Sequence, residues 1–289
     1  MIGTELKESA TRLRDRQVVA RERAQLAHAA LGACRLCPQD CGVNRLADER
    51  GWCRAGSTAR VFSAQIGVGD ELELIPTFAI AFNGCDMRCA FCITGADSWN
   101  PQRGEPFDAA GLAMKATAAL QAGARTVMIL GGEPTIHLPE AIRFVAALPS
   151  SARLIWKTNA YISIEARALL AGLFDVWLAD YKFGNDRCAE RLAKIGDYQL
   201  RVQDTLFWAS HASELIIRHL LMPGHVDCCW EPVARWIGAH LPLTKVSLRC
   251  GFWPAWKTGR HAELRRTVRT AEEQRAVEIA RSYGLHLVE

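Results

Sequence analysis

The sequence contains no hydrophobic run of about 18 residues, no internal repeat and no low-complexity tract. A membrane-spanning helix needs about 20 mostly apolar residues, so we expect no membrane span. The N-terminal stretch 1–17 is charged from its fifth residue and lacks the apolar region of a secretory signal. We therefore expect a cytoplasmic protein.

A strong excess of charge is also missing, because the net charge is only +4 over 289 residues. With 49% hydrophobic and 23% charged residues, the composition is that of an ordinary globular protein. The positive excess is local, since residues 257–269 hold five Lys/Arg against one Glu. Most such runs are solvated surface, so we do not expect a nucleic-acid partner.

Cysteine, in contrast, is plentiful, with eleven in the chain. Without an export signal these cysteines should be reduced, so clustered ones indicate metal ligands rather than disulfides. Segment 33–70 is too small to bury a core, and a metal would hold it together. Both zinc and an auxiliary iron–sulfur cluster fit, and zinc is slightly favoured because nothing in the sequence requires a second redox centre. The four ligands would be Cys34, Cys37, Cys41 and Cys53.

A second group of cysteines lies in "FNGCDMRCAFC", residues 82–92. Its three thiols are one fewer than the set that zinc or an iron–sulfur cluster normally takes. A C-x3-C-x2-C loop can hold three corners of a [4Fe–4S] cube and leave the fourth iron open. A zinc site completed by a distant residue and a set of unligated thiols are the alternatives.

From residue 76 onward, apolar β-rich runs alternate with helical patterns. We predict strands at 77–82, 126–130, 153–158, 175–181, 214–221 and 245–250. Helices are predicted at 5–31, 108–123, 137–148, 163–173, 186–213, 227–241 and 271–283. Strands that are apolar on both faces, each followed by a helix, predict a parallel sheet covered by helices.

No glycine fingerprint of a doubly wound sheet is present, so we predict an α/β partial (β/α)6 TIM-like barrel. Its site would lie at the carboxyl ends of the strands. The chain would divide into an N-terminal helix (1–32), the four-cysteine metal-binding segment (33–70), the barrel (71–250), and a basic loop with a C-terminal helix (251–289).

Polar residues end each predicted strand and should meet at one mouth of this barrel. They are Asn83 and the three cysteines, "GGEP" at 131–134, Lys157 to Asn159, Asp180 and Lys182, Arg218 and His219, and Arg249 with Cys250. Neighbouring residues of a strand point to opposite faces, so only one of Arg218 and His219 can face the interior. We expect Cys188 on a helix face and treat neither Cys228 nor Cys229 as a metal ligand.

The motifs of the chain carry a resemblance to a known family. In order from residue 34 to 225, the chain contains "CRLCPQDCGVNR", "FNGCDMRCAFC" with aromatic Phe91 before the last cysteine, "GGEPTIHL", "TNAY", "ADYKF" and "IRHLLMPGH". It resembles the radical S-adenosylmethionine (SAM) superfamily. Within that superfamily it is similar to the pyruvate formate-lyase activating enzyme group and its relatives with an N-terminal CxxCPxxCGVNR segment.

The resemblance implies that Cys85, Cys89 and Cys92 bind a [4Fe–4S] cluster whose open iron takes the amino and carboxylate groups of SAM. One electron, from a donor such as flavodoxin or ferredoxin, would cleave the sulfonium bond to a 5′-deoxyadenosyl radical that abstracts hydrogen from a substrate. Glu133 would meet the methionyl ammonium, and Lys182 beside Asp180 would reach the carboxylate. The other candidate cofactor-binding residues are Asn83, Gly131, Gly132, Lys157, Asn159, Arg218 and His219.

Lys157 departs from the group pattern, in which an aspartate before Thr-Asn helps to hold a metal cation. A lysine cannot ligate a cation, but its ammonium can stand in for one, and our hypothesis is that Lys157 replaces the ion. The alternative is that Lys157 points outward or pairs with Asp180.

Two departures from the group, Lys157 and the N-terminal cysteine segment, favour an enzyme that modifies a protein, a peptide or a small molecule. An activating enzyme of a glycyl-radical enzyme is the alternative. A non-catalytic zinc or iron–sulfur protein that binds nucleic acid, and tRNA modification by the same chemistry, are further alternatives.

Overall fold

A single nine-stranded sheet forms the centre of the computed structural model, which describes residues 2–69 and 71–288, with side chains from residue 16 onward. The strand order is β3-β1-β2-β4-β5-β6-β7-β8-β9. The strands are β1 (Arg60–Gly67), β2 (Thr77–Phe82), β3 (Glu105–Pro106), β4 (Thr126–Gly131), β5 (Leu154–Thr158), β6 (Val176–Asp180), β7 (Glu214–Leu220), β8 (Lys245–Arg249) and β9 (His286–Leu287). The helices are α1 (Ile2–Ala29), α2 (Ala96–Trp99), α3 (Ala109–Gln121), α4 (Leu138–Ala147), α5 (Ile164–Leu170), α6 (Asp186–Ala193), α7 (Tyr198–Ala212), α8 (Glu231–His240) and α9 (Thr270–Ser282), with a π-helical turn η4 (Val226–Trp230) before α8.

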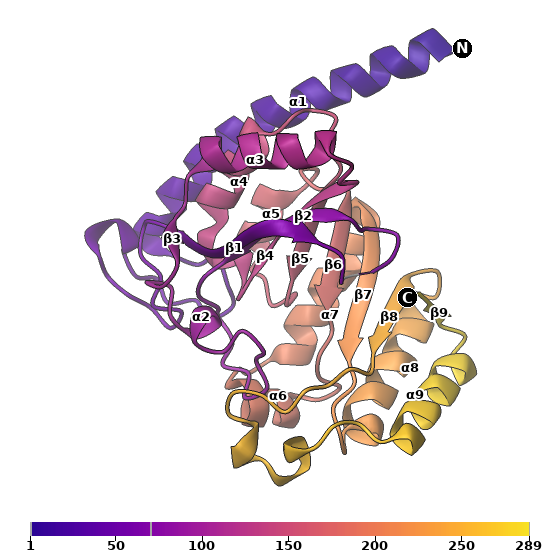
Figure 1. The fold of residues 1–289 in the computed structure, drawn as a ribbon. Helices are drawn as coiled ribbons and strands as arrows, with labels where there is room; N and C mark the ends of the chain where they lie inside the picture. Colours follow the sequence, from indigo (N-terminus) through magenta and orange to yellow (C-terminus); the bar gives the residue numbers. More distant parts are fainter. Residues whose placement is uncertain (1, 70, 289) are drawn as a thin grey trace.

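The predicted α/β partial barrel is confirmed. From β2 to β9 neighbouring strands are parallel and stand in sequence order, apart from β3, which pairs with β1 instead, so the sheet has no switch point of the doubly wound kind. Helices lie along the convex side of the curved sheet (Figure 1). The edge strands were not predicted: β1 lies in the segment assigned to the four cysteines and pairs antiparallel with β2 and β3.

The single helix predicted over 186–213 is wrong, because the chain breaks between α6 and α7. Lys194 and Asp197 adopt left-handed backbone with φ of 60° and 49°, on either side of Gly196. Left-handed residues cannot continue a right-handed helix, and the break turns α7 back along the sheet. The helix predicted over 227–241 also starts irregularly, as the π-helical turn Val226–Trp230.

Alternation along the strands builds two packed layers and positions the site. Met128, Ile155, Leu178 and Ile216 form part of an inner apolar cluster, whereas their strand neighbours such as Trp156 pack toward the helices. Successive residues point to opposite faces, so the same register turns residues 157, 180 and 218 to the inner side at the strand ends. The charged side chains at the strand ends thus lie next to the inner apolar cluster, on the same side of the sheet.

The N-terminal helix α1 lies along α4 (Figure 1). Its buried face consists of small residues, Ala20, Ala24 and Ala27, whose three- and four-residue spacing forms one helical stripe. Arg16 adds an ion pair of 2.7 Å to Asp175 at the far end of the sheet. None of the described helices has the length and apolarity needed to cross a membrane.

Candidate active site

A cavity of about 1070 Å³ opens at the carboxyl ends of the parallel strands. The side chains of Cys85, Cys89 and Cys92 line it. Nine further residues expected at the mouth also line it, namely Gly131, Gly132, Lys157, Asn159, Asp180, Lys182, Arg218, Arg249 and Cys250. The strand ends therefore bring the expected thiols and charged groups together.

Backbone hydrogen bonds from α6 hold the three-cysteine loop in place. The amides of Arg88 and Ala90 donate to the carbonyls of Ala193 and Leu192, each at 2.8 Å, at the end of α6. Burial raises the pKa of Cys89 to about 12, against the opposing charge of Lys182. A buried thiol of this kind keeps its proton until a metal replaces it.

The opposite side of this loop is held by Asn159 at the end of β5. Its side-chain amide donates to the carboxylate of Asp86 at 2.7 Å. Burial raises the pKa of Asp86, and its second carboxylate oxygen has no hydrogen-bond partner. Asp86 is a buried acidic group directly after Cys85 that the sequence patterns did not single out.

The glycines of "GGEP" are required by close backbone contact. A Cβ on Gly132 would lie 2.0 Å from the carbonyl oxygen of Gly84, and one on Gly131 would lie 2.4 Å from that of Phe82. The amide of Glu133 donates to the Gly84 carbonyl at 2.9 Å. The end of β4 therefore packs directly on the residue that precedes Cys85, where no side chain fits.

Glu133 itself lies outside the cavity lining. Its carboxylate is buried and accepts hydrogen bonds from the amide of Asn159 at 2.8 Å and from the hydroxyl of Thr158 at 2.9 Å. Burial, and secondly the charge of Asp86, raise its pKa. Glu133 thus ties β4 to β5 beneath the cysteine loop, and we leave it out of the proposed SAM contacts.

Asn83 and His219 are also outside the cavity. Asn83 is fully buried, and its side-chain amide donates to Asp97 O at 3.4 Å. His219 lies on the helix-facing side of β7, where Nδ1 is 2.6 Å from the carbonyl oxygen of Tyr181 and the ring packs on Trp230. Burial lowers the pKa of His219 to about 4, so it is a neutral core histidine, and Arg218 is the residue of this pair that faces the cavity.

The charged layer in the cavity is mostly positive. Asp180 forms an ion pair with Lys182, and Arg218 lies 3.6 Å from the buried carboxylate of Glu71. Burial alone would raise the pKa of Asp180, but Lys182, Arg218 and Lys157 outweigh it and lower the pKa. Burial would lower the pKa of Lys182, and Asp180 reverses the effect. Asp180 is therefore held as a carboxylate and Lys182 as an ammonium, and the excess of cationic side chains in the layer suits an anionic ligand.

The four-cysteine segment packs directly on the three-cysteine loop. The indole of Trp52 donates to the carbonyl of Asp86 at 2.8 Å, and the guanidinium of Arg88 lies 5.3 Å from the Trp52 ring. Arg45 is 1% exposed, and its guanidinium contacts Cys34 Sγ at 3.6 Å together with the carbonyls of Gly56 and Ile136. A buried guanidinium thus lies directly beside one thiol of the four-cysteine segment.

The basic run 257–269 is not a uniform positive surface. The ammonium of Lys257 lies 3.7 Å from the centre of the Trp99 ring, and its amide donates to Ala90 O at 2.9 Å. Arg266 pairs with Glu272 at 2.6 Å. This segment therefore serves as a wall beside the cysteine loop. Aromatic and polar residues that the sequence did not flag complete the lining, among them Thr94, Ser98, Trp99, Phe252 and Trp253.

The fold and the cavity define an α/β protein that presents three thiols and a charged layer at the carboxyl ends of its parallel strands. The chain belongs to the radical SAM superfamily, whose family model matches residues 80–237. It is similar to an uncharacterised protein of Methanocaldococcus jannaschii, with 31% identity over 273 residues, 88% of this chain and 76% of that protein. The family implies an enzyme with an iron–sulfur cluster and SAM as cofactors.

Solved structures share the fold at low identity. Streptococcus suis SuiB bound to its precursor peptide SuiA aligns with a TM-score of 0.54 and 15% identity over 70% of this chain. SuiB bound to SAM gives a TM-score of 0.52 over 71% of this chain. The chain spans less than half of SuiB, 46% and 47% in the two structures. A domain of a pyruvate-formate lyase-activating enzyme from Bacteroides vulgatus aligns with a TM-score of 0.47 and 16% identity, over 56% of this chain and 97% of that domain.

Proposed function

We propose that this protein cleaves SAM reductively at a [4Fe–4S] cluster held by Cys85, Cys89 and Cys92 and modifies a protein or peptide substrate. The carrying observation is that the three thiols share one cavity with Asp180, Lys182 and Arg218. The donor set fits the group, because three thiols leave one iron for SAM and the charged layer offers partners for its carboxylate. Bound together, cluster and SAM supply a 5′-deoxyadenosyl radical that abstracts hydrogen.

The chain's own residues would bind and orient SAM. Lys182 and Arg218 would bind its carboxylate, and Asp180, which forms an ion pair with Lys182, would hold that lysine in position and accept from the methionyl ammonium. Walls formed by Phe252 and Trp99 exclude water from the cavity. An electron donor such as a flavodoxin or ferredoxin would approach from outside.

Changing Lys182 to Met is expected to weaken SAM binding. A hydrogen bond to a charged group contributes roughly 1.5–3 kcal/mol, which corresponds to about a 10- to 100-fold rise in the SAM dissociation constant. This dissociation constant is measured by equilibrium binding of SAM to the reconstituted, unreduced protein. The exposed Lys115, changed to Met, is the matched control and should bind SAM as the parent does. Equal affinity in the two variants would contradict the proposed role of Lys182.

Lys157 lines the cavity and lowers the pKa of Asp180 through its charge, so it does not point outward. We propose that its ammonium replaces the cation of the activating-enzyme group. SAM cleavage by the parent should then be unchanged when Na⁺ and K⁺ are exchanged for a bulky organic cation. Lys157→Asp should make cleavage depend on Na⁺ or K⁺, because a carboxylate can ligate these ions, whereas Lys157→Met should lose roughly tenfold and not recover with either ion. A strict cation requirement in the parent would refute the replacement.

For the N-terminal set we propose an auxiliary iron–sulfur cluster rather than zinc. Tetrahedral zinc holds four sulfurs about 3.8 Å apart. Within the described residues, the group of candidate ligands whose atoms all lie within 4.8 Å of one another does not include these four cysteines. Sulfurs that lie farther apart than in a zinc site suit a cluster, where each sulfur binds a separate iron. The hydrogen bond from the Trp52 indole to the carbonyl of Asp86 supports this proposal, because it would keep the two clusters near each other and shorten the path for electron transfer.

The rim of the cavity supports a large substrate. At about 1070 Å³ the cavity is slightly larger than the roughly 300–1,000 Å³ typical of small-ligand pockets. Exposed apolar side chains line its edge, including Val68, Leu72, Ile93 and Trp253. Such exposed groups are typical of a surface that binds another chain.

The test is anaerobic reconstitution with iron and sulfide, followed by reduction with SAM present and measurement of 5′-deoxyadenosine. Formation of 5′-deoxyadenosine in the reduced protein, and none without reduction, supports the proposal; no formation overturns it. Adding separately the peptide–protein and low-molecular-weight fractions of a cell extract then assigns the substrate class by which fraction raises turnover. One 5′-deoxyadenosine per partner chain with a lasting protein radical would indicate the activating-enzyme alternative.

A further inference from the structure

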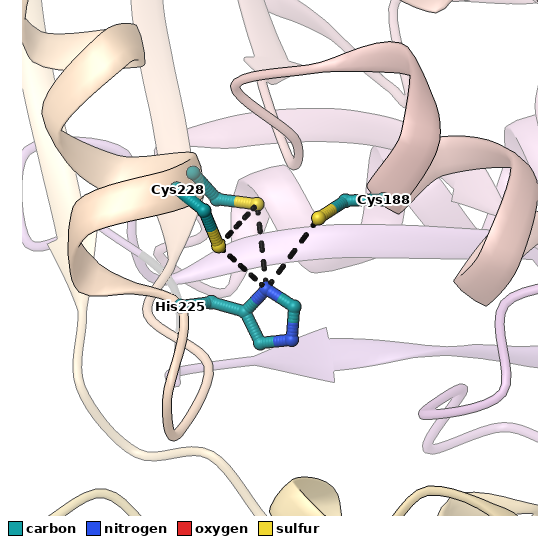
Figure 2. Close-up of side chains that lie close together, drawn as sticks. Cys188, His225 and Cys228 are labelled. Atoms are coloured by element: carbon teal, nitrogen blue, oxygen red, sulfur yellow. Dashed lines mark hydrogen bonds between the residues drawn. The ribbon is translucent and has the colours of Figure 1, made fainter.

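Four candidate metal ligands converge away from the main cavity. Cys188 lies in α6, and His225, Cys228 and Cys229 lie in the turn after β7 and in η4. Their ligand atoms all lie within 4.8 Å of one another. Figure 2 shows the His225 ring and the sulfurs of Cys188 and Cys228 directed toward a common point.

The distances match those of one tetrahedral ion. From His225 Nδ1 the sulfurs of Cys188, Cys228 and Cys229 lie at 3.8, 3.2 and 3.5 Å, and the sulfurs of Cys228 and Cys229 are 3.9 Å apart. Zn–S bonds of about 2.3 Å and Zn–N bonds of about 2.0 Å in a tetrahedron place ligand atoms about 3.5–3.8 Å apart. A [4Fe–4S] cluster would put each ligand on a separate iron and hold them farther apart.

We propose that Cys188, His225, Cys228 and Cys229 bind one Zn²⁺ in a closed Cys3His site. Thiolate and imidazole ligands in a tetrahedral arrangement suit zinc. Four protein ligands leave no open position, so the ion is structural rather than catalytic. Binding exchanges the thiol protons for the metal and releases them to solvent.

The surroundings of the histidine are those of a metal-bound imidazole. When Nδ1 binds the ion, Nε2 carries the proton, and it lies 3.6 Å from the carboxylate of Glu263. Arg191 pairs with Glu263 at 2.5 Å and lies 3.3 Å from Nε2; since both of these groups are donors in that tautomer, the Glu263 carboxylate is the acceptor that they share. Three thiolates and Zn²⁺ leave one negative charge, which this arginine balances.

An entry path for the metal is present. Cys188, His225 and Cys229 are 5%, 3% and 0% exposed, respectively, whereas Cys228 is half-buried. A second cavity of about 450 Å³ reaches Cys188, His225 and Cys228 from the surface. The ligands are therefore shielded from solvent on one side and open to an incoming ion on the other.

The site would fix the mouth of the barrel. Cys188 is on α6, whose last carbonyls accept from Arg88 and Ala90 in the three-cysteine loop. The other ligands follow β7, which carries Arg218 to the cavity. A zinc ion between α6 and η4 would therefore lock the support of the cluster loop to the strand that presents Arg218.

The test is metal analysis of the full chain, purified without oxygen and given zinc before iron reconstitution. The zinc K-edge absorption spectrum should show three sulfurs and one nitrogen, with bond lengths of about 2.3 and 2.0 Å. Changing Cys188 and Cys228 together to Ser should remove this zinc, one ion per chain. Cys250→Ser is the control and should retain it, because Cys250 is the cysteine outside the three groups.

A second variant separates weaker zinc binding from a folding defect. Glu263→Gln keeps all four ligands and should weaken zinc binding by roughly 10-fold or more in competition with a chelator. Unchanged zinc content in the double serine variant would overturn the proposal. A zinc shell of four sulfurs without nitrogen would do the same, since it would place the zinc in the N-terminal set.

Discussion

Replacing Cys85, Cys89 and Cys92 together by alanine is expected to abolish 5′-deoxyadenosine formation. No other cysteine lines the cavity among the described residues except Cys250, which cannot replace three ligands. Loss of an essential group costs roughly three orders of magnitude in rate or more, so product should fall to the protein-free level. Quantifying 5′-deoxyadenosine after reduction with SAM present measures this.

Metal content provides the control for this triple variant. About four irons per chain should be lost, while the metals of the N-terminal set and of the Cys188 group stay. Iron that remains, with an iron–sulfur absorption spectrum, would identify an auxiliary cluster at Cys34, Cys37, Cys41 and Cys53. Product formation that survives the triple change would refute the central proposal.

Gly132→Ala is expected to have the next largest effect. The added methyl would lie 2.0 Å from the Gly84 carbonyl, and a backbone atom cannot move aside as the end of a side chain can. Overpacking of this kind should lower the free energy of unfolding by roughly 3 kcal/mol and displace the start of the three-cysteine loop. Urea denaturation and iron content after reconstitution should both fall relative to the parent.

Gly196→Ala is the matched control. Nothing lies within 4 Å of the position its Cβ would take, and it lies in the break between α6 and α7. Its stability should stay within about 0.5 kcal/mol of the parent, and its iron content should be unchanged. If Gly132→Ala had the same stability and iron content as this control, the close contact between β4 and the three-cysteine loop would not be needed for either property.

The parallel strands were predictable because they are buried on both faces. Residues 77–82 form β2 as predicted, and the other five core strands differ by a residue or two. Strand alternation could also show that only one of Arg218 and His219 faces inward, but not which. That choice depends on the register of β7 against β6, where Arg218 pairs with Asp180, and register is a tertiary property.

The group formed by Cys188, His225, Cys228 and Cys229 could not be predicted in the same way. The spacing His225, Cys228, Cys229 offered a weak local signal, since it places three ligands in one turn. Cys188 is 37 residues away from His225 and joins them only because the break at Lys194 and Asp197 fixes α6 against η4. The burial of Glu133 was likewise not predictable, because two of its hydrogen-bond partners, Thr158 and Asn159, come from the end of β5, 25 and 26 residues away.

Both borders of the sheet end in strands of only two residues, β3 and β9. A long border strand offers a row of backbone donors and acceptors to which another polypeptide can add. Here β3 is short and contains Pro106, whose ring nitrogen cannot donate, and it covers Arg60 and Val61, the end of β1 nearest the mouth. A polypeptide substrate of the kind proposed above would therefore be held at the mouth by its side chains and charges rather than by pairing with the sheet.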